Sequence, residues 1–101
     1  MIVLRFKVHC QAGKREQALA AFERVIGPSR EVEGVMSFDI GQDLTDPDVI
    51  FGVEVFEDRA ALDRQEAQQV VQEAIAQFGE LVTEEIEATI FHVSSSEPWG
   101  G

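Results

Sequence analysis

The fold is decided by residues 49–56, which read Val49-Ile50-Phe51-Gly52-Val53-Glu54-Val55-Phe56. Alternate residues of a β-strand point to opposite faces of a sheet, and here both sets are largely apolar. The pattern therefore predicts a central strand that is covered on both sides. Glu54 is the one charge in this stretch, and it shares a face with Gly52 and Phe56.

Three further stretches alternate with the same period and predict the other strands. They are residues 2–9, 35–42 and 83–93. Each has one face that we expect to point toward the core. Those faces carry Ile2, Leu4, Phe6 and Val8; Met36, Phe38 and Ile40; and Ile86, Ala88, Ile90 and His92.

The segments between the strands show the spacing of amphipathic helices. Residues 14–26 place apolar side chains three and four positions apart. We expect this helix to kink or end at Gly27-Pro28, because proline has no amide hydrogen to donate, with a further turn through residues 29–32. A short helix over residues 59–65 follows the cap residue Asp58. The apolar stripe then lapses and resumes over residues 70–82, which predicts a separate helix to about Gly79.

This order of elements predicts a ferredoxin-like βαββαβ sandwich of the α+β class, with helices on one face of a four-stranded antiparallel sheet. The expected strand order is 4-1-3-2. One domain is expected over residues 1–93, since 101 residues fit a single domain. Residues 94–101 show no pattern and are expected to form a flexible tail that contains Trp99.

Charge and composition exclude several classes of partner. The chain has 8 Lys and Arg against 19 Asp and Glu, a net charge of −11. Nucleic acid and anionic membranes would be repelled, and the sheet has no basic aromatic stripe of the kind that binds RNA.

The apolar runs are too short to span a bilayer, and a single cysteine, Cys10, excludes an internal disulfide. We expect a cytoplasmic protein.

The sheet face without helices carries too many apolar residues to lie bare in water. Burying five such side chains contributes about 7–15 kcal/mol, comparable with the stability of a whole domain. We therefore expect a homodimer packed through this face, with strand charges that can pair across neighbouring strands. A solvated face with a few apolar residues is the alternative. The predicted interface residues are Val3, Arg5, Val49, Phe51, Val53, Val55 and Glu87.

Several local strings resemble the antibiotic biosynthesis monooxygenase family of small dimeric α+β barrel proteins. They are Phe6-Lys7-Val8 running to Gly13-Lys14, Ser29-Arg30 with Glu33-Gly34 and Phe38-Asp39, and Val53-Glu54-Val55-Phe56-Glu57-Asp58 with Ala60-Ala61-Leu62. The resemblance covers about residues 1–93. It implies a dimer, and a cavity between the helices and the sheet that takes a small aromatic or quinol substrate. The implied lining residues are Phe6, Phe38, Gly52, Phe56, Leu62, Gln65, Ile75 and Phe78.

The residues that serve catalysis in such proteins do not carry over to this chain. The haem-degrading branch uses an Asn, a Trp and a His where this chain has Phe6, Gln65 and Ile75. The anthrone-oxidising branch uses an Asn, a Trp and a Tyr where Gly52, Phe56 and Leu62 stand. Many quinol-oxidising members have a His at the position of Gln65. The resemblance thus supports the fold more strongly than it supports any one activity.

Two functions follow from these residues. The first is a monooxygenase that needs no cofactor or metal, because a deprotonated hydroquinone can itself pass an electron to oxygen inside a dry pocket. Glu54 is the candidate base and His92 a candidate base or proton shuttle; each has an alternative structural role. The second is a catalytically silent dimeric binding or stress-associated module of the same fold. An open pocket of roughly 300 Å³ or more with Glu54 at its wall favours the enzyme.

Overall fold

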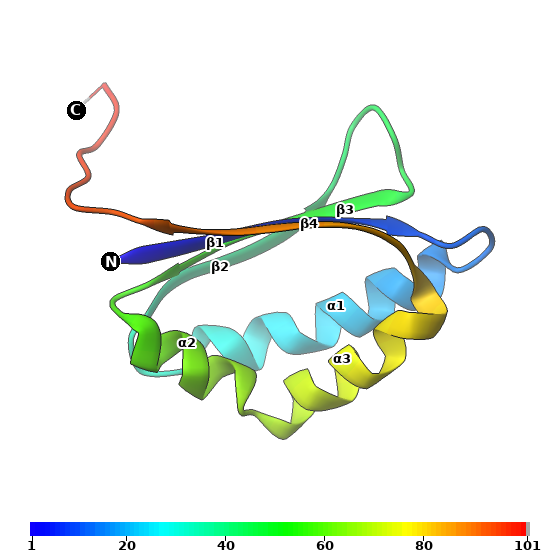
Figure 1. Cartoon of the computed structure of the whole chain (residues 1–101), viewed down its shortest axis with the longest axis horizontal. Helices are drawn as coiled ribbons and strands as arrows, with labels where there is room; N and C mark the ends of the chain where they lie inside the picture. The colour runs from blue at the N-terminus through cyan, green and yellow to red at the C-terminus, as the bar shows by residue number, and fades with distance from the viewer. Residues whose placement is uncertain (101) are drawn as a thin grey trace.

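Four antiparallel strands form one sheet in the order β2-β3-β1-β4, which is the predicted order. A computed structural model of the chain describes residues 1–100. Along the chain, the elements are β1 (Ile2–Cys10), α1 (Arg15–Arg30), β2 (Val35–Gln42), β3 (Val49–Phe56), α2 (Arg59–Glu66), α3 (Gln69–Leu81) and β4 (Val82–His92). In the described part of the chain all three helices lie on one face of the sheet (Figure 1), which confirms the ferredoxin-like α+β fold.

The register of the strands places the predicted inward residues side by side. Leu4 of β1 lies between Glu54 of β3 and Ile90 of β4, and Phe6 lies between Gly52 and Ala88. These even-numbered positions face the helices. Between α2 and α3 the chain turns at Ala67-Gln68, where the apolar stripe of the sequence lapses.

Gly52 is the position at which the sheet requires the smallest side chain. A Cβ atom at Gly52 would lie 2.1 Å from Cε2 of Phe6, closer than carbon atoms can approach. The ring of Phe6 therefore lies directly over the backbone of β3, and glycine at 52 is what makes room for it.

A β-bulge in β2 corrects the predicted inward face of that strand. The pairing with β3 shifts between Val35 and Ser37, so that one extra residue lies in β2. Val35 packs against two of the core clusters, whereas Met36 is 57% exposed. The prediction that Met36 shares the inward face with Phe38 and Ile40 is therefore wrong, because a bulge reverses the alternation at one point.

The sequence predicts that the first helix kinks or ends at Gly27-Pro28. The helix does not end there, because α1 continues to Arg30. A proline in the last turn removes a single helical hydrogen bond. The carbonyl of Pro28 accepts hydrogen bonds from the backbone amide of Glu31, at 3.3 Å, and from Nε2 of Gln68, at 3.1 Å. These contacts satisfy the end of α1 and join it to the turn between α2 and α3.

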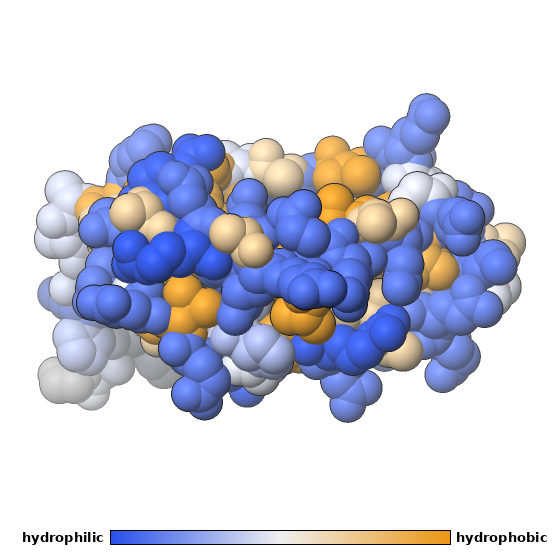
Figure 2. Space-filling view, turned by 90° about the horizontal axis from the view of Figure 1, so that it is seen from below, coloured by the Kyte–Doolittle hydropathy of each residue, from blue (hydrophilic) through white to orange (hydrophobic). Residues whose placement is uncertain are grey.

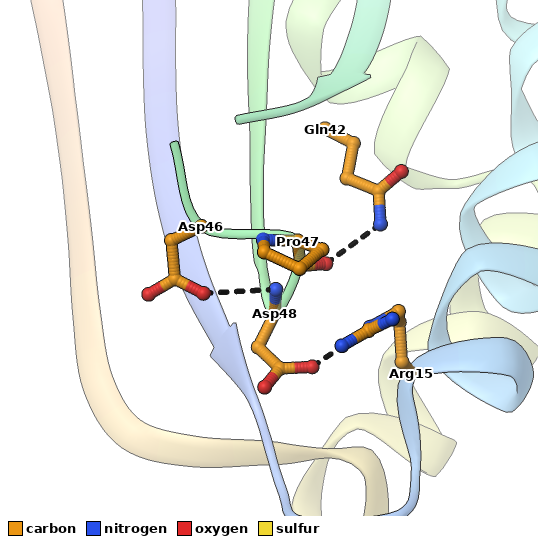
Figure 3. Close-up of polar contacts among 5 residues, drawn as sticks. All are labelled: Arg15, Gln42, Asp46, Pro47 and Asp48. Atoms are coloured by element: carbon orange, nitrogen blue, oxygen red, sulfur yellow. Dashed lines mark hydrogen bonds and ion pairs between the residues drawn. The ribbon is translucent and has the colours of Figure 1, made fainter. Parts of the chain in front are cut away.

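The loop from β2 to β3 is tied to the start of α1 (Figure 3). Asp48 accepts a hydrogen bond from Nε of Arg15 at 2.8 Å, and its amide donates to Asp46 Oδ1. The backbone of Val49 bonds back to Asp43 and Asp46. Because the loop folds onto the start of β3, Val49 is only 4% exposed. The prediction that Val49 contributes to an interface between subunits is therefore wrong.

Residues 93–100 carry no helix or strand, and Trp99 is fully exposed. The amide of Val93 donates to the carbonyl of Met1, which holds the start of this segment beside β1. The last residue of the predicted tail, Gly101, lies outside the described residues. Within residues 1–100, no helix is long and apolar enough to cross a membrane.

Candidate functional site

A cavity of about 260 Å³ lies between the sheet and the helices. Its volume is slightly below the 300 Å³ expected of a typical ligand pocket. All four strands and all three helices contribute to its walls. The lining residues are Leu4, Phe6, Val8, Phe22, Val25, Phe38, Ile40, Glu54, Gln65, Glu66, Val71, Ala74, Ile75, Phe78, Val82, Ile86 and Ala88.

Aromatic rings form one continuous part of the cavity wall. The ring of Phe22 on α1 stacks against Phe6 of β1 at a centroid distance of 5.6 Å and against Phe78 of α3 at 4.9 Å. Phe38 of β2 is buried and adds a further ring to the lining. Stacked rings of this kind offer a flat apolar surface against which an aromatic ligand can pack.

Glu54 is the buried ionisable group of this wall. Its side chain points to the helical face of β3, between Leu4 of β1 and Phe38 of β2, and the residue is 6% exposed. Among residues 1–100, no side chain or backbone group forms a hydrogen bond or ion pair with its carboxyl group. Burial, and secondarily the charge of Glu66, raises the pKa of Glu54 from 4.5 to about 7.

Gln65 is held at the cavity by a buried hydrogen bond. Its Nε2 donates to Oγ of Ser29 at 3.0 Å, which links α2 to α1. Both residues are buried, and neither is charged. Because a carboxamide does not take up a proton near neutral pH, Gln65 is a polar neighbour of a ligand and cannot serve as a base.

The structure brings together most of the predicted site. Phe6, Phe38, Glu54, Gln65, Ile75 and Phe78 all line the cavity. Four predicted residues do not line it. Three of them lie inside the fold: Phe56 and Leu62 are fully buried in a packed cluster with Ile2 and Ala61, and Gly52 lies beneath the ring of Phe6. His92 is exposed at the end of β4 and is not among the lining residues.

Eleven lining residues were not among the predicted site residues, and they include Phe22, Glu66 and Ile86. Phe22 has the helical spacing of a core residue, which gave no sign that its ring borders a cavity. Glu66 is exposed and closes α2, where nothing in the sequence distinguishes it from other surface carboxylates. For Ile86, the one sign of a place at the cavity was its position on the predicted inward face of residues 83–93.

The cavity opens beside α3 and the edge strand β4. Ile75 of α3 is 46% exposed and Ile86 of β4 is 56% exposed, although both line the cavity. Ala88 is exposed too, so the helices leave part of the inward face of β4 uncovered. Viewed from the helical side, the surface is largely hydrophilic, with hydrophobic side chains showing between the polar ones (Figure 2). A ligand can therefore reach the cavity from solvent.

The fold and the site define a class: a small α+β sandwich whose sheet and helices enclose an open, aromatic-walled cavity with one buried carboxyl group. A sequence model of the antibiotic biosynthesis monooxygenase family matches residues 1–77, and the chain belongs to this family. The matched region includes Glu54, Gln65 and Glu66 but not β4.

Solved structures share the fold of this chain. Rv0793 from Mycobacterium tuberculosis has a TM-score of 0.88 at 21% identity, covering 96% of this chain and 98% of its own. Protein SO0527 from Shewanella oneidensis has a TM-score of 0.83 at 28% identity, with coverage of 91% and 89%. PA3566 from Pseudomonas aeruginosa has a TM-score of 0.85 at 19% identity, with coverage of 93% and 94%. No curated protein sequence matches the chain.

Proposed function

We propose that the chain is a cofactor-independent monooxygenase that acts on a small aromatic or quinol substrate, with Glu54 as its general base. The observation that carries this proposal is a buried carboxyl group, free of any partner in residues 1–100, on the wall of an open aromatic cavity. A carboxyl group whose pKa lies near 7 is matched to proton removal at neutral pH. Family membership supplies the reaction type.

The reaction needs no external reductant when the substrate is a hydroquinone. Ionised Glu54 takes a phenolic proton, and the electron-rich phenolate reduces O2. One oxygen atom enters the ring, which becomes a hydroxyquinone, and the other leaves as water. The two electrons that reduce this second atom to water come from the hydroquinone itself. The protein's part is orientation, exclusion of water and acceptance of a proton, and the cavity and Glu54 fit these roles.

We expect activity to follow the ionised fraction of Glu54. In an assay of O2 uptake with a panel of hydroquinones, kcat/KM should rise with pH and level off above about 7, the pKa of Glu54. Glu54→Gln should lower kcat/KM by about 100-fold or more, within the usual contribution of a general base. Glu23→Gln, which removes an exposed charge from α1, should leave turnover unchanged.

The alternative function is a binding module of the same fold without turnover. The cavity volume just below the usual range favours it. If saturable binding of aromatic ligands occurs without O2 uptake across the hydroquinone panel, the binding module is correct and the monooxygenase proposal is wrong. If wild type and Glu54→Gln turn over equally, Glu54 is not the base.

We also propose that two copies pair through the sheet face that carries no helices. Phe51, Val53 and Phe91 are exposed large apolar residues at odd-numbered positions of this face. The strand register sets Val3 directly between Val55 and Phe91, and it sets Lys7 opposite Glu87. The remaining predicted interface residues, Arg5 and Glu87, are exposed on the same face.

A cytoplasmic location stays a prediction, which cell fractionation would test.

Substitution of Val53 by glutamate is expected to separate the dimer. Val53 lies in the central strand, between Arg5 and Asp39, and a charged side chain in the middle of an apolar contact between two copies would be strongly unfavourable. Light scattering should report about 22 kDa for wild type and about 11 kDa for Val53→Glu. Gln17→Glu on the exposed side of α1 adds the same charge and should stay dimeric. A wild-type mass of about 11 kDa at micromolar concentration would contradict the proposed pairing.

A further inference from the structure

The ionisable residues of the cavity all have the same sign of charge. Glu54 and Glu66 line it, and no lysine, arginine or histidine is among the lining residues. Gln65 is the one other polar side chain in the lining, and its amide is bonded to Ser29. The cavity therefore has no group that could neutralise an anionic ligand, and it has two carboxylates that repel one.

Glu54 lacks the donors that a buried carboxylate normally has. An ionised carboxylate away from water is costly unless it accepts hydrogen bonds or faces a positive charge. No such contact exists in the described chain, although the residue is 6% exposed and lines the cavity. The missing donors are those a ligand can bring. A hydroxyl group supplies one donor, whereas an ammonium group supplies three donors and the opposite charge.

Glu66 extends this preference toward solvent. It lies at the end of α2, it is exposed, and its charge acts on Glu54 across the cavity wall. The carbonyl end of a helix has a partial negative charge, which adds to that of Glu66 itself. With a net charge of −11, the whole molecule attracts cations from solution and repels anions.

A second hollow continues from the cavity along α3 and β4. It has a volume of about 460 Å³ and shares Phe78, Val82 and Ile86 with the cavity. Its one charged lining residue is Glu84, again an acid. A substituent too large for the cavity could lie in this groove, and the groove has no cationic side chain to pair with an anionic substituent.

We propose that this cavity takes small aromatic molecules that carry a protonated amine, with the ammonium group at Glu54 and Glu66 and the ring against the phenylalanine wall. The proposal rests on the proposed function in taking this cavity as the substrate site, and it names the charge class of that substrate. In a hydroquinone substrate the phenolic hydroxyl group lies at Glu54, which can then act as the base, and the ammonium group pairs with Glu66 toward solvent. An amine without a phenol pairs with both carboxylates. Phe6, Phe22 and Phe78 supply the apolar wall for the ring.

Three probes with one carbon skeleton test the proposal: 2-phenylethylamine, 2-phenylethanol and phenylacetate. By calorimetry at about pH 8, we expect the amine to bind about 10-fold or more tightly than the alcohol, as a charge-assisted pair would give. Phenylacetate should show no saturable binding. Equal affinity for phenylacetate and the amine would overturn the proposal.

Variants of the two carboxylates locate the contact. Glu54→Gln should weaken amine binding by about 10-fold or more and alcohol binding by less than about 3-fold. Glu66→Gln, an exposed substitution that should not disturb folding, should weaken amine binding by about 3-fold. Glu23→Gln should change neither affinity. Equal losses for amine and alcohol in Glu54→Gln, or no loss for the amine in either carboxylate variant, would contradict a charge-specific contact.

The amine should also bind less tightly in acid. Glu54 and Glu66 are the titratable groups that the surrounding elements present to the site, since the lining residues of β1, β2, α1, α3 and β4 are apolar. Lowering the pH from about 8 to about 5.5 protonates Glu54 and should weaken amine binding to wild type by about 10-fold. Glu54→Gln should lose most of this pH dependence, and an unchanged dependence would contradict the role of Glu54.

The proposal and the proposed function can fail separately. If the order of affinities holds but no hydroquinone supports O2 uptake, the charge class of the ligand stands and the monooxygenase is wrong. If amine-bearing and carboxylate-bearing hydroquinones are turned over with equal kcat/KM, the charge class is wrong while the oxygenase stands.

Discussion

Gly52→Ala is expected to lower the free energy of unfolding by about 2–3 kcal/mol, an effect typical of overpacking in a dense core. The new Cβ would lie 2.1, 2.5 and 2.9 Å from three ring atoms of Phe6, so the ring has to move. On its other side the ring is stacked against Phe22, which limits where it can go. The open direction is the cavity, so the variant should bind aromatic ligands more weakly as well. Urea unfolding monitored by circular dichroism gives the stability.

A double variant separates this clash from a general intolerance of side chains in β3. Phe6→Leu removes the ring edge, so Gly52→Ala should cost less in that background than in wild type, by about 1 kcal/mol or more. Gly79→Ala in α3 is the matched control: its Cβ would meet nothing within 4 Å, and alanine favours a helix. It should leave stability unchanged or raise it. Additive costs of Phe6→Leu and Gly52→Ala would show that the ring is not the obstacle.

Glu54→Gln is expected to change how stability depends on pH. The pKa of Glu54 is about 7 in the folded chain against 4.5 when unperturbed, so between these values the folded state binds more protons than the unfolded state. This group therefore stabilises the fold fully below about pH 4.5, and its contribution is lost as the pH rises through 7. From about pH 5.5 to about pH 8.5, wild type should lose about 2 kcal/mol relative to Glu54→Gln.

The comparison uses a difference between two pH values because a buried amide has its own cost, which does not vary with pH. That constant cost cancels when the difference between wild type and Glu54→Gln at about pH 5.5 is subtracted from the difference at about pH 8.5. Glu23→Gln removes an exposed charge from α1 and should follow wild type across the range. If the curves of wild type and Glu54→Gln run parallel, Glu54 does not titrate near 7 in the folded protein.

Residues 49–56 show why the sheet could be predicted from sequence. A strict period of two, with Glu54 and Gly52 on the face that also carries Phe56, assigns each side chain to a face, and neighbouring strands with the same period complete the sheet. The bulge at Val35 could not be predicted in the same way. It depends on which β3 residue each β2 residue pairs with, and that is a property of the assembled sheet.

The candidate site was predicted in part for a similar reason. The alternation of side chains along a strand correctly predicted that Phe6, Phe38 and Glu54 point toward the helices. This alternation cannot distinguish a side chain that fills space from one that borders a cavity. For this reason Phe56 and Leu62 were expected at the cavity, although they pack in a closed cluster. Whether a void remains depends on how far the helices extend over β4, and no local pattern encodes that distance.

The ionisation of Glu54 is the property on which the base, the charge class of the ligand and the pH dependence all depend. Its most direct measurement is a 13C NMR titration of the side-chain carboxyl carbon in protein labelled at glutamate, with Glu54→Gln used to assign the resonance. We predict a midpoint of about 7 for Glu54, well above those of the exposed glutamates. A midpoint below about 5, in the ordinary range of glutamate, would contradict the account.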